Sequence, residues 1–250
     1  MSNEVDSSAL EDELDDNFAL ASSLYKQGLF DRAINLYEEC ISGYIYLEKG
    51  SDSVYVASTY NNIAAAYSTK GDFEKALQYH EKSLQIKLKK YEDSHPEIAD
   101  SYNNIAIVYY NQADYVRALS NYNKSLIIYT SKLGKNHPKV ADTYYNIGIV
   151  YYNHNKFDKA LSYYGEAVQI RQRELGSDHP AVADIYHNMA TVYHCQSDYE
   201  RAVEYYKKCL RIYKVSYGAD HPDVSMATNN LQMLELERQE RPQSTPKKSL

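Results

Sequence analysis

The chain has 250 residues, and 44% of them are hydrophobic, which is enough to build a packed core and argues against general disorder. Its formal net charge is −7, and residues 1–16 contain seven acids and no base, so the remainder of the chain is neutral. A neutral body lacks the concentrated basic patch that nucleic-acid binding requires, and no apolar run approaches the roughly 18 residues of a membrane-spanning helix. We therefore expect no nucleic-acid ligand and no membrane insertion.

The acidic segment, residues 1–16, is expected to be a disordered and solvated N-terminal tail, because a run of like charges repels itself. An alternative is that it acts as a pseudo-ligand for a basic surface. The segment lacks the basic, apolar and small-residue order of a signal peptide. The three cysteines, Cys40, Cys195 and Cys209, show neither metal-type spacing nor an even-numbered disulfide pattern. These features predict a reduced, cytoplasmic setting.

An internal repeat organises the rest of the chain. The dipeptide His-Pro begins at His95, His137, His179 and His221, at a constant interval of 42 residues. A period of this size predicts stacked supersecondary repeats, in which each repeat contacts only its neighbours. The predicted repeats span about residues 17–52, 53–94, 95–136, 137–178 and 179–220, with a capping segment at 221–239 and a flexible tail at 240–250. The first repeat fits the period with one extra residue before Ser53.

Each repeat predicts two helices joined by a short turn. Apolar and tyrosine side chains recur at spacings of three and four, which places them on one helix face. In the repeat from His95 the first helix carries Ile98, Tyr102, Ile105, Ala106 and Tyr109. Pro96 suits a first helical turn, and the turn between the helices falls at Gly71 and its equivalents Ala113, Asn155 and Ser197. The pattern predicts an all-α, right-handed solenoid of about five helix pairs with a C-terminal capping helix.

The order of aromatic and small residues in each repeat resembles the tetratricopeptide repeat. Its tryptophan position holds Tyr60, Tyr102, Tyr144 and Tyr186, and the apolar and small pair that follows holds Ile63-Ala64, Ile105-Ala106, Ile147-Gly148 and Met189-Ala190. The next aromatic positions hold Tyr67, Tyr109, Tyr151 and Tyr193, then Phe73, Tyr115, Phe157 and Tyr199. The match covers about residues 17–235. The resemblance implies a right-handed tetratricopeptide superhelix whose first helices line a concave face.

The 42-residue length narrows the resemblance to the repeats of kinesin light chains and nephrocystin-3-type proteins, whose sequence pattern is similar. This resemblance implies a protein-interaction adaptor with cargo or cytoskeletal partners and a cytoplasmic, cytoskeleton-associated location. Kinesin light chains also carry a long heptad coiled coil ahead of their repeats, where this sequence has only the acidic segment. We therefore expect a free-standing repeat module.

One column of asparagines is the main candidate binding feature. Asn62, Asn104, Asn146, Asn188 and Asn230 occupy one position, which in the second to fifth repeats lies two residues after the core tyrosine of the first helix. In superhelical arrays of the resembled family an asparagine at the matching position contacts the backbone of an extended peptide, and a carboxamide offers both the donor and the acceptor for this. The alternative is that these side chains bond within or between helices and hold the packing. The first repeat departs from the column, with Ala19 at this position.

Variable side chains beside this column are expected to set ligand specificity. They are Asn61, Asn103, Tyr145 and His187 directly before the asparagines, and Tyr110, Tyr152 and His194 two turns later. Domains of the resembled family that clamp an acidic chaperone tail do so with Lys and Arg, which these positions lack. The expected ligand is therefore an aromatic, aliphatic or basic segment of a protein or peptide. Asp100, Asp142 and Asp184 recur near the helix starts, where they either favour the helix dipole or form an acidic stripe.

Neither a catalytic site nor a cofactor or metal site is expected. The G-x-S-x-G, P-loop and H-E-x-x-H motifs do not occur. One histidine per repeat cannot converge on zinc, because repeats stack about 10 Å apart and Zn–N bonds are about 2 Å long. The periodic histidines are instead expected to cap helices. We predict a non-enzymatic adaptor or scaffold; the alternative is an architectural subunit that assembles end to end or through its convex face, where Tyr79, Tyr163 and Tyr205 share one second-helix position.

Overall fold

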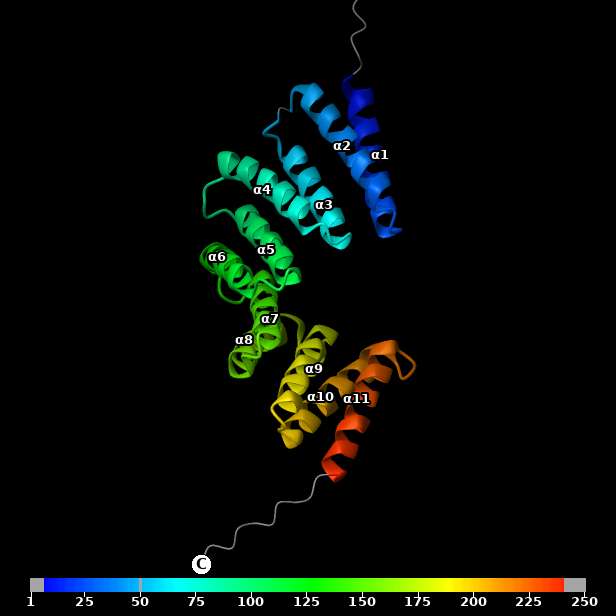
Figure 1. Cartoon of the computed structure of the whole chain (residues 1–250), viewed down its shortest axis with the longest axis vertical. Helices are drawn as coiled ribbons and strands as arrows, with labels where there is room; N and C mark the ends of the chain where they lie inside the picture. The colour runs from blue at the N-terminus through cyan, green and yellow to red at the C-terminus, as the bar shows by residue number, and fades with distance from the viewer. Residues whose placement is uncertain (1–6, 50, 241–250) are drawn as a thin grey trace, which may run out of the picture. The chain divides into compact units, whose positions relative to one another are not determined.

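The computed structural model describes residues 7–49 and 51–240, and this part of the chain consists of α-helices and one π-helical turn (Figure 1). It divides into two compact halves, an N-terminal half that ends at Lys135 and a C-terminal half that begins at Asn136. The N-terminal half contains α1 (Ser7–Lys26), α2 (Phe30–Tyr44), η1 (Ile45–Lys49), α3 (Val54–Thr69), α4 (Phe73–Lys90), α5 (Pro96–Asn111) and α6 (Tyr115–Leu133). The C-terminal half contains α7 (Pro138–Asn153), α8 (Phe157–Leu175), α9 (Pro180–Cys195), α10 (Tyr199–Tyr217) and α11 (Pro222–Glu240).

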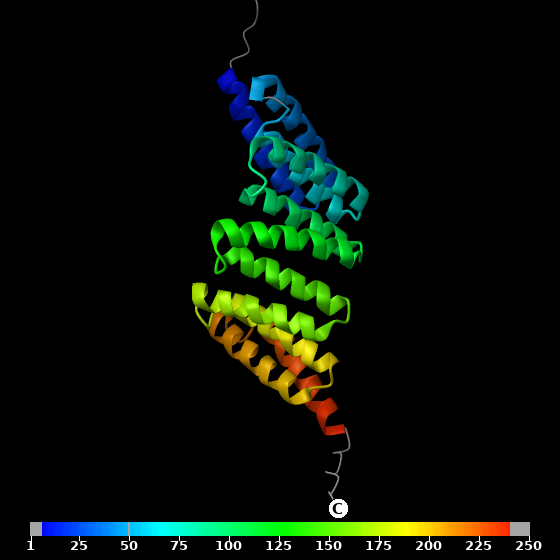
Figure 2. The same ribbon diagram turned by 90° about the vertical axis from the view of Figure 1, so that its left-hand side faces the viewer.

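Within each half, helices that follow one another in the chain pack side by side (Figures 1 and 2). The closest pairs are α1 with α2, α3 with α4, α5 with α6, α7 with α8 and α9 with α10, and α11 packs against α10. Each pair consists of a first helix and a second helix, which a short turn joins. The predicted all-α architecture of consecutive helix pairs is confirmed.

The His-Pro dipeptides begin the first helices. His95, His137 and His179 are N-caps, and Nδ1 of each accepts a hydrogen bond from the backbone N–H two residues later, at 3.1 to 3.2 Å. The imidazole thereby satisfies a backbone donor that has no partner inside the helix, and the proline that follows needs no such partner. Their predicted role as capping residues is confirmed.

The turn inside each repeat needs one residue with a positive φ. Gly28 and Gly71 have φ of 79° and 82°, and Ala113, Asn155 and Ser197 adopt φ of 57°, 57° and 62°. This left-handed conformation costs a residue with a Cβ about 1–2 kcal/mol. Ala113 and Ser197 suit the turn least, so the packing of the helices on both sides must hold them in it.

The predicted disordered tail is wrong for residues 7–16, because α1 begins at Ser7. Leu14 lies on the inner face of this helix and is only 5% exposed. It packs against Gly43 of α2, where the missing Cβ leaves room for the leucine side chain. The acids on either side of Leu14 are exposed, so solvent screens their repulsion while the leucine stays buried. Residues 1–6 lie outside the described part of the chain, and so do residues 241–250 of the predicted C-terminal tail.

The first repeat contains the π-helical turn Ile45–Lys49 directly after α2. A π-helical turn holds one more residue than an α-helical turn. It therefore accommodates the extra residue that the sequence shows before Ser53. The Ser53 side chain then caps α3 by accepting a hydrogen bond from the N–H of Val56, and the following repeats keep a common register.

Tyrosine rings fill the space between the two helices of most repeats. In the second, fourth and fifth repeats one second-helix ring packs on two first-helix rings, with centroid distances of 5.3 to 5.9 Å. Lysine or arginine side chains cover these clusters. The second-helix rings are those of Tyr79, Tyr163 and Tyr205, which are half-buried parts of the helix packing rather than an exposed stripe.

Candidate functional site

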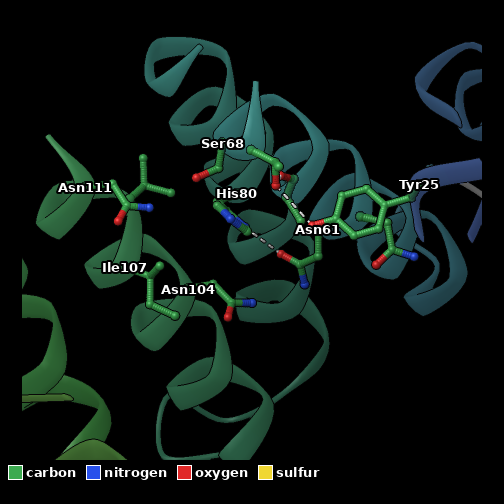
Figure 3. Close-up of a pocket in the computed structure, with 11 residues that line it drawn as sticks. Tyr25, Asn61, Ser68, His80, Asn104, Ile107 and Asn111 are labelled. Atoms are coloured by element: carbon green, nitrogen blue, oxygen red, sulfur yellow. Dashed lines mark hydrogen bonds between the residues drawn. The ribbon is translucent and has the colours of Figure 1, made fainter. Parts of the chain in front are cut away.

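A concavity of about 360 Å³, which we call the asparagine recess, opens on the first-helix face of the N-terminal half. First helices α1, α3 and α5 and one residue of α4 form it (Figure 3). The predicted site residues Asn61, Asn62 and Asn104 are among the side chains that line it. The full lining is Tyr25, Asn61, Asn62, Ala65, Ser68, Thr69, His80, Asn104, Ile107, Val108 and Asn111.

His80 and Asn61 form the central polar contact of the recess. His80 Nδ1 lies 2.9 Å from Asn61 Oδ1, and Figure 3 shows the imidazole pointing at the amide oxygen. Burial and, to a smaller extent, the nearby Lys87 ammonium together lower the pKa of His80 to about 4. The imidazole is therefore neutral at pH 7, with its proton on Nδ1, where it donates to the Asn61 oxygen. Its Nε2 is left as an acceptor.

The other carboxamides of the recess differ in how they are bonded. Asn62 reaches the hydroxyl of Tyr37 on α2, where its hydrogen bond acts against the burial that raises the pKa of this tyrosine. Asn104 on α5 makes no side-chain hydrogen bond to any residue in the described part of the chain. At the edge of the recess Tyr25 and Thr69 join α1 to α3 through a 3.1 Å hydroxyl contact (Figure 3). Asn104 thus offers both N–H groups and its oxygen to a ligand.

The recess opens at this repeat because small side chains replace a pair of rings. In three other repeats a first-helix ring packs on a second-helix tyrosine at 5.4 to 5.8 Å, namely Phe18–Tyr37, Tyr145–Tyr164 and His187–Tyr206. Asn61 and His80 hold the same two positions and fill less space. Ala65 adds to the difference, since the third and fourth repeats carry Ile107 and Ile149 at its position.

Most of the predicted site residues of the C-terminal half make hydrogen bonds within the chain instead. Each contact joins one first helix to the next, from α7 to α9 or from α9 to α11. The pairs are Asn188 Nδ2 to Tyr145 Oη at 2.7 Å, Asn230 Nδ2 to His187 Nε2 at 2.9 Å, Tyr152 Oη to Cys195 Sγ at 3.7 Å, and His194 Nε2 to Glu237 Oε2 at 2.8 Å. Burial lowers the pKa of His187, which keeps its imidazole neutral and able to accept from the amide. Asn188 and Asn230 therefore hold helix packing, the alternative that the sequence left open for this column.

The remaining predicted residues lie apart from these contacts. Asn103 and Tyr110 are half-buried on α5 but do not line the asparagine recess. Asn146 is half-buried on α7 and, like Asn104, makes no side-chain hydrogen bond to any residue in the described part of the chain, but it does not line the recess. The sequence did not point to Tyr25, Thr69, Asn111 or His80. A signal for His80 was present, because it interrupts a column of tyrosines formed by Tyr37, Tyr122, Tyr164 and Tyr206.

The periodic aspartates are acceptors within their own repeats. Asp142 accepts from Arg171 at 2.9 Å, Asp184 accepts from the Tyr213 hydroxyl at 2.7 Å, and Asp100 accepts from Tyr129. Each bond joins a first helix to the second helix of the same repeat. These carboxylates are therefore committed to intramolecular partners, and this corrects the reading of them as an open acidic stripe.

The family of the chain follows from its repeats. The tetratricopeptide repeat family model matches residues 16–89, 97–173, 155–214 and 182–244, which together are most of the sequence. The chain belongs to the tetratricopeptide repeat family. Repeats of this family serve as protein-interaction scaffolds and are generally non-catalytic, so the family indicates an interaction role. No curated protein matches the sequence.

Several solved structures share the fold. BtubC (BKLC) from P. vanneervenii is 20% identical with a TM-score of 0.66, over 95% of this chain and 97% of that one. The nearly identical TPR-like repeats of a putative kinesin light chain from Podosopora anserina are 20% identical with a TM-score of 0.68, over 82% and 97%. A STAND ATPase with a tetratricopeptide repeat sensor from Pyrococcus horikoshii is 23% identical with a TM-score of 0.73, over 90% of this chain and 33% of that one. The predicted resemblance to repeats of the kinesin-light-chain type is confirmed at the level of the fold.

Residues 7–49 and 51–240 offer neither a metal site nor a membrane-spanning helix. No cluster of three or more His, Cys, Asp or Glu side chains there could hold a metal ion. No helix in the same range has the length and apolar character to cross a membrane. The asparagine recess is thus the feature on which a functional proposal can be built.

Proposed function

We propose that this protein is a non-enzymatic adaptor that holds an extended segment of a partner protein on the first-helix face of its N-terminal half. The observation that carries the proposal is Asn104, a carboxamide with no internal hydrogen bond in a recess lined by three more asparagines. A polar side chain that the fold does not use for itself is available to a ligand, and a carboxamide matches the donor and acceptor of a peptide unit.

The C-terminal half contributes less to this surface in our proposal. Asn188 and Asn230 each use one amide N–H on a neighbouring helix, so a ligand meets carboxamides that are already oriented and partly satisfied. Two further predicted residues there, Tyr152 and His194, are likewise bonded. We assign to this half the role of a supporting scaffold with secondary ligand contacts.

The class of partner follows from the charge of the recess. None of its lining residues is Lys, Arg, Asp or Glu, and His80 is neutral at pH 7. An acidic chaperone tail would find no cation to pair with, and nucleic acid would find no basic surface. The likeness to kinesin-light-chain repeats adds cargo or cytoskeletal proteins in the cytoplasm as the partner class to test first.

Comparative affinity purification tests the adaptor proposal. Wild-type protein, Asn104→Ala and Asn123→Ala would be purified from cells in parallel, followed by binding measurements with the recovered partner. Asn123 is an exposed asparagine on the second helix α6, so its loss controls for removing a surface amide elsewhere. We expect Asn104→Ala to lose the partner and Asn123→Ala to retain it. Equal retention by both variants would contradict binding at this face.

A second candidate function, an architectural subunit that stacks end to end, is favoured by one observation. The final helix α11 exposes Met226, Met233 and Leu236 at 43%, 59% and 59%, so it is not the uniformly polar cap that its charged residues indicate. Exposed apolar side chains at the end of a repeat array are candidates for self-association. A mass that rises with protein concentration in light scattering, and falls back for Met233→Glu, would support this function; a constant monomer mass would exclude it.

A further inference from the structure

We infer that the asparagine recess selects an uncharged carboxamide side chain, that of Gln or Asn, from the segment that it binds. The inference rests on the proposed function, because it takes the first-helix face of the N-terminal half as the binding surface. The proposed function concerns the backbone of the bound segment, and this inference names a side chain of that segment that the surface also recognises.

The size of the recess fits a side chain. Small-molecule sites commonly measure roughly 300–1,000 Å³, and the recess, at about 360 Å³, is at the lower end of that range. Such a space takes one medium-sized side chain and the backbone next to it. Ala65, Ile107 and Val108 form an apolar wall that suits the methylene groups of such a side chain.

The polar groups of the recess form the complement of an amide. The Asn61 oxygen is occupied by His80, which leaves its NH₂ group as a donor, and Asn104 has its donors and its oxygen free. His80 Nε2 provides a further acceptor. A ligand carboxamide presents one carbonyl and one NH₂ group, so it can satisfy a donor and an acceptor at once.

Other side-chain classes fit less well. A carboxylate or an ammonium group would find no charged residue in the lining to pair with, so taking it out of water there is unfavourable. An apolar or aromatic side chain would cover the Asn104 carboxamide and leave it without a hydrogen bond, at the desolvation cost of that group. The recess therefore discriminates by charge and by hydrogen bonding together.

The sequence of the second repeat creates this site locally. His80 stands where four other repeats have tyrosine, and Asn61 stands where Phe18, Tyr145 and His187 supply rings. Ala65 completes the space. The same three positions in the fourth repeat, Tyr145, Ile149 and Tyr164, carry larger side chains.

Nuclear magnetic resonance on the full chain tests the inference directly. The probes are the peptides Ac-Ala-Ala-Xaa-Ala-Ala-NH₂ with Gln, Glu, Lys or Ala at the centre, and the readout is the side-chain amide signals of Asn61 and Asn104. We expect the Gln peptide to shift both signals with at least about tenfold higher affinity than the other three, which is the worth of roughly one net hydrogen bond. Equal affinity of the Gln and Ala peptides would overturn side-chain selection and leave backbone binding at this face intact.

Two variants of Ala65 separate a filled recess from a misfolded one. Ala65→Ile places there the side chain that Ile107 and Ile149 supply at the same position, so the fold should accept it, as circular dichroism would verify. We expect this variant to lose the preference for Gln, and Ala65→Ser to keep it. If the purified partner still requires Asn104 but binds Ala65→Ile as tightly as wild type, the selection inference fails while the adaptor function stands. If Asn104→Ala keeps the partner, the adaptor function itself fails.

Discussion

The two halves of the molecule place the same column of asparagines in different situations. In the C-terminal half Tyr145 and His187 are long enough to reach the next first helix, and each binds the asparagine there. In the N-terminal half Asn61 stands at the equivalent position, is shorter, and turns to His80 of α4. Asn104 on the next first helix is therefore left without a partner. The residue before the asparagine of one repeat thus decides whether the asparagine of the next repeat holds two first helices together or faces a ligand.

In our account the C-terminal half uses asparagines for stability, whereas the N-terminal half uses them for ligand recognition. Repeat proteins gain their stability from contacts within and between adjacent repeats, and the C-terminal half uses Asn188 and Asn230 for that purpose. The N-terminal half gives up a pair of packed rings at Asn61 and His80 and gains a recess. We expect substitutions at equivalent positions in the two halves to differ in how much they change stability and binding.

Removing the second-helix ring should have the largest effect. Tyr206 is 3% exposed, packs against His187 and contacts Thr191 at 3.1 Å, so Tyr206→Ala should lower the free energy of unfolding by about 3–5 kcal/mol. His80→Ala at the matching position should cost only about 1–2 kcal/mol, because Asn61 can turn into the open recess. Urea denaturation of both variants measures this difference; equal losses would contradict the contrast between the halves.

Acid should weaken the N-terminal half through His80. The fold holds the pKa of His80 at about 4, against 6.5 for the free side chain. As the pH falls below 6.5, His80 takes up a proton in the unfolded chain but not in the folded one. The free energy of unfolding therefore decreases between pH 6.5 and 4, by about 3 kcal/mol in total. Urea midpoints across this range should fall more steeply for wild type than for His80→Gln. Identical slopes would show that His80 titrates normally.

The recess can be closed with residues that the fourth repeat already uses. The double variant Asn61→Tyr/His80→Tyr reproduces the Tyr145–Tyr164 pair and brings a hydroxyl toward Asn104. We expect the free energy of unfolding to rise by about 1–2 kcal/mol, from ring packing and one hydrogen bond, and partner binding to weaken at least tenfold. Stabilisation with unchanged binding would show that the recess is not the binding site.

The smallest expected effect concerns the turns. Ala113 is exposed and has φ of 57°, so Ala113→Gly should relieve the strain of the left-handed conformation. We expect a net stabilisation of about 0.5–1 kcal/mol, after subtraction of the larger conformational entropy that glycine has in the unfolded chain. The control is Gly71→Ala, which imposes the same strain at φ 82° and should destabilise by a similar amount. Differential scanning calorimetry of both variants measures the pair.

The sequence predicted the features that repeat and missed those that depend on a single exception. The His-Pro period, the capping imidazoles and the helix pairs follow from local rules that every repeat obeys. The start of α1 did not follow, because the acidic composition of residues 1–16 concealed Leu14, the one buried side chain among residues 7–16, which anchors the helix.

The partners of the asparagines could not be predicted for a related reason. Hydrogen bonds such as Asn188 to Tyr145 span 43 residues and depend on side-chain length and direction in three dimensions. The recess forms only because three small or short side chains, Asn61 and Ala65 on α3 and His80 on α4, lie next to one another. His80 was the one member with a visible signal, because it breaks a tyrosine column.

The measurement that tests the account most directly compares Asn104→Ala with Asn188→Ala, using the partner recovered with the wild-type protein. For each variant, isothermal titration calorimetry would give the affinity and urea denaturation the free energy of unfolding. We predict that Asn104→Ala weakens binding at least tenfold and changes stability by less than about 0.5 kcal/mol. Asn188→Ala should keep the affinity and lose about 1 kcal/mol, because the Tyr145 hydroxyl loses its partner. Equal effects of the two variants on binding would contradict the division of roles between the halves.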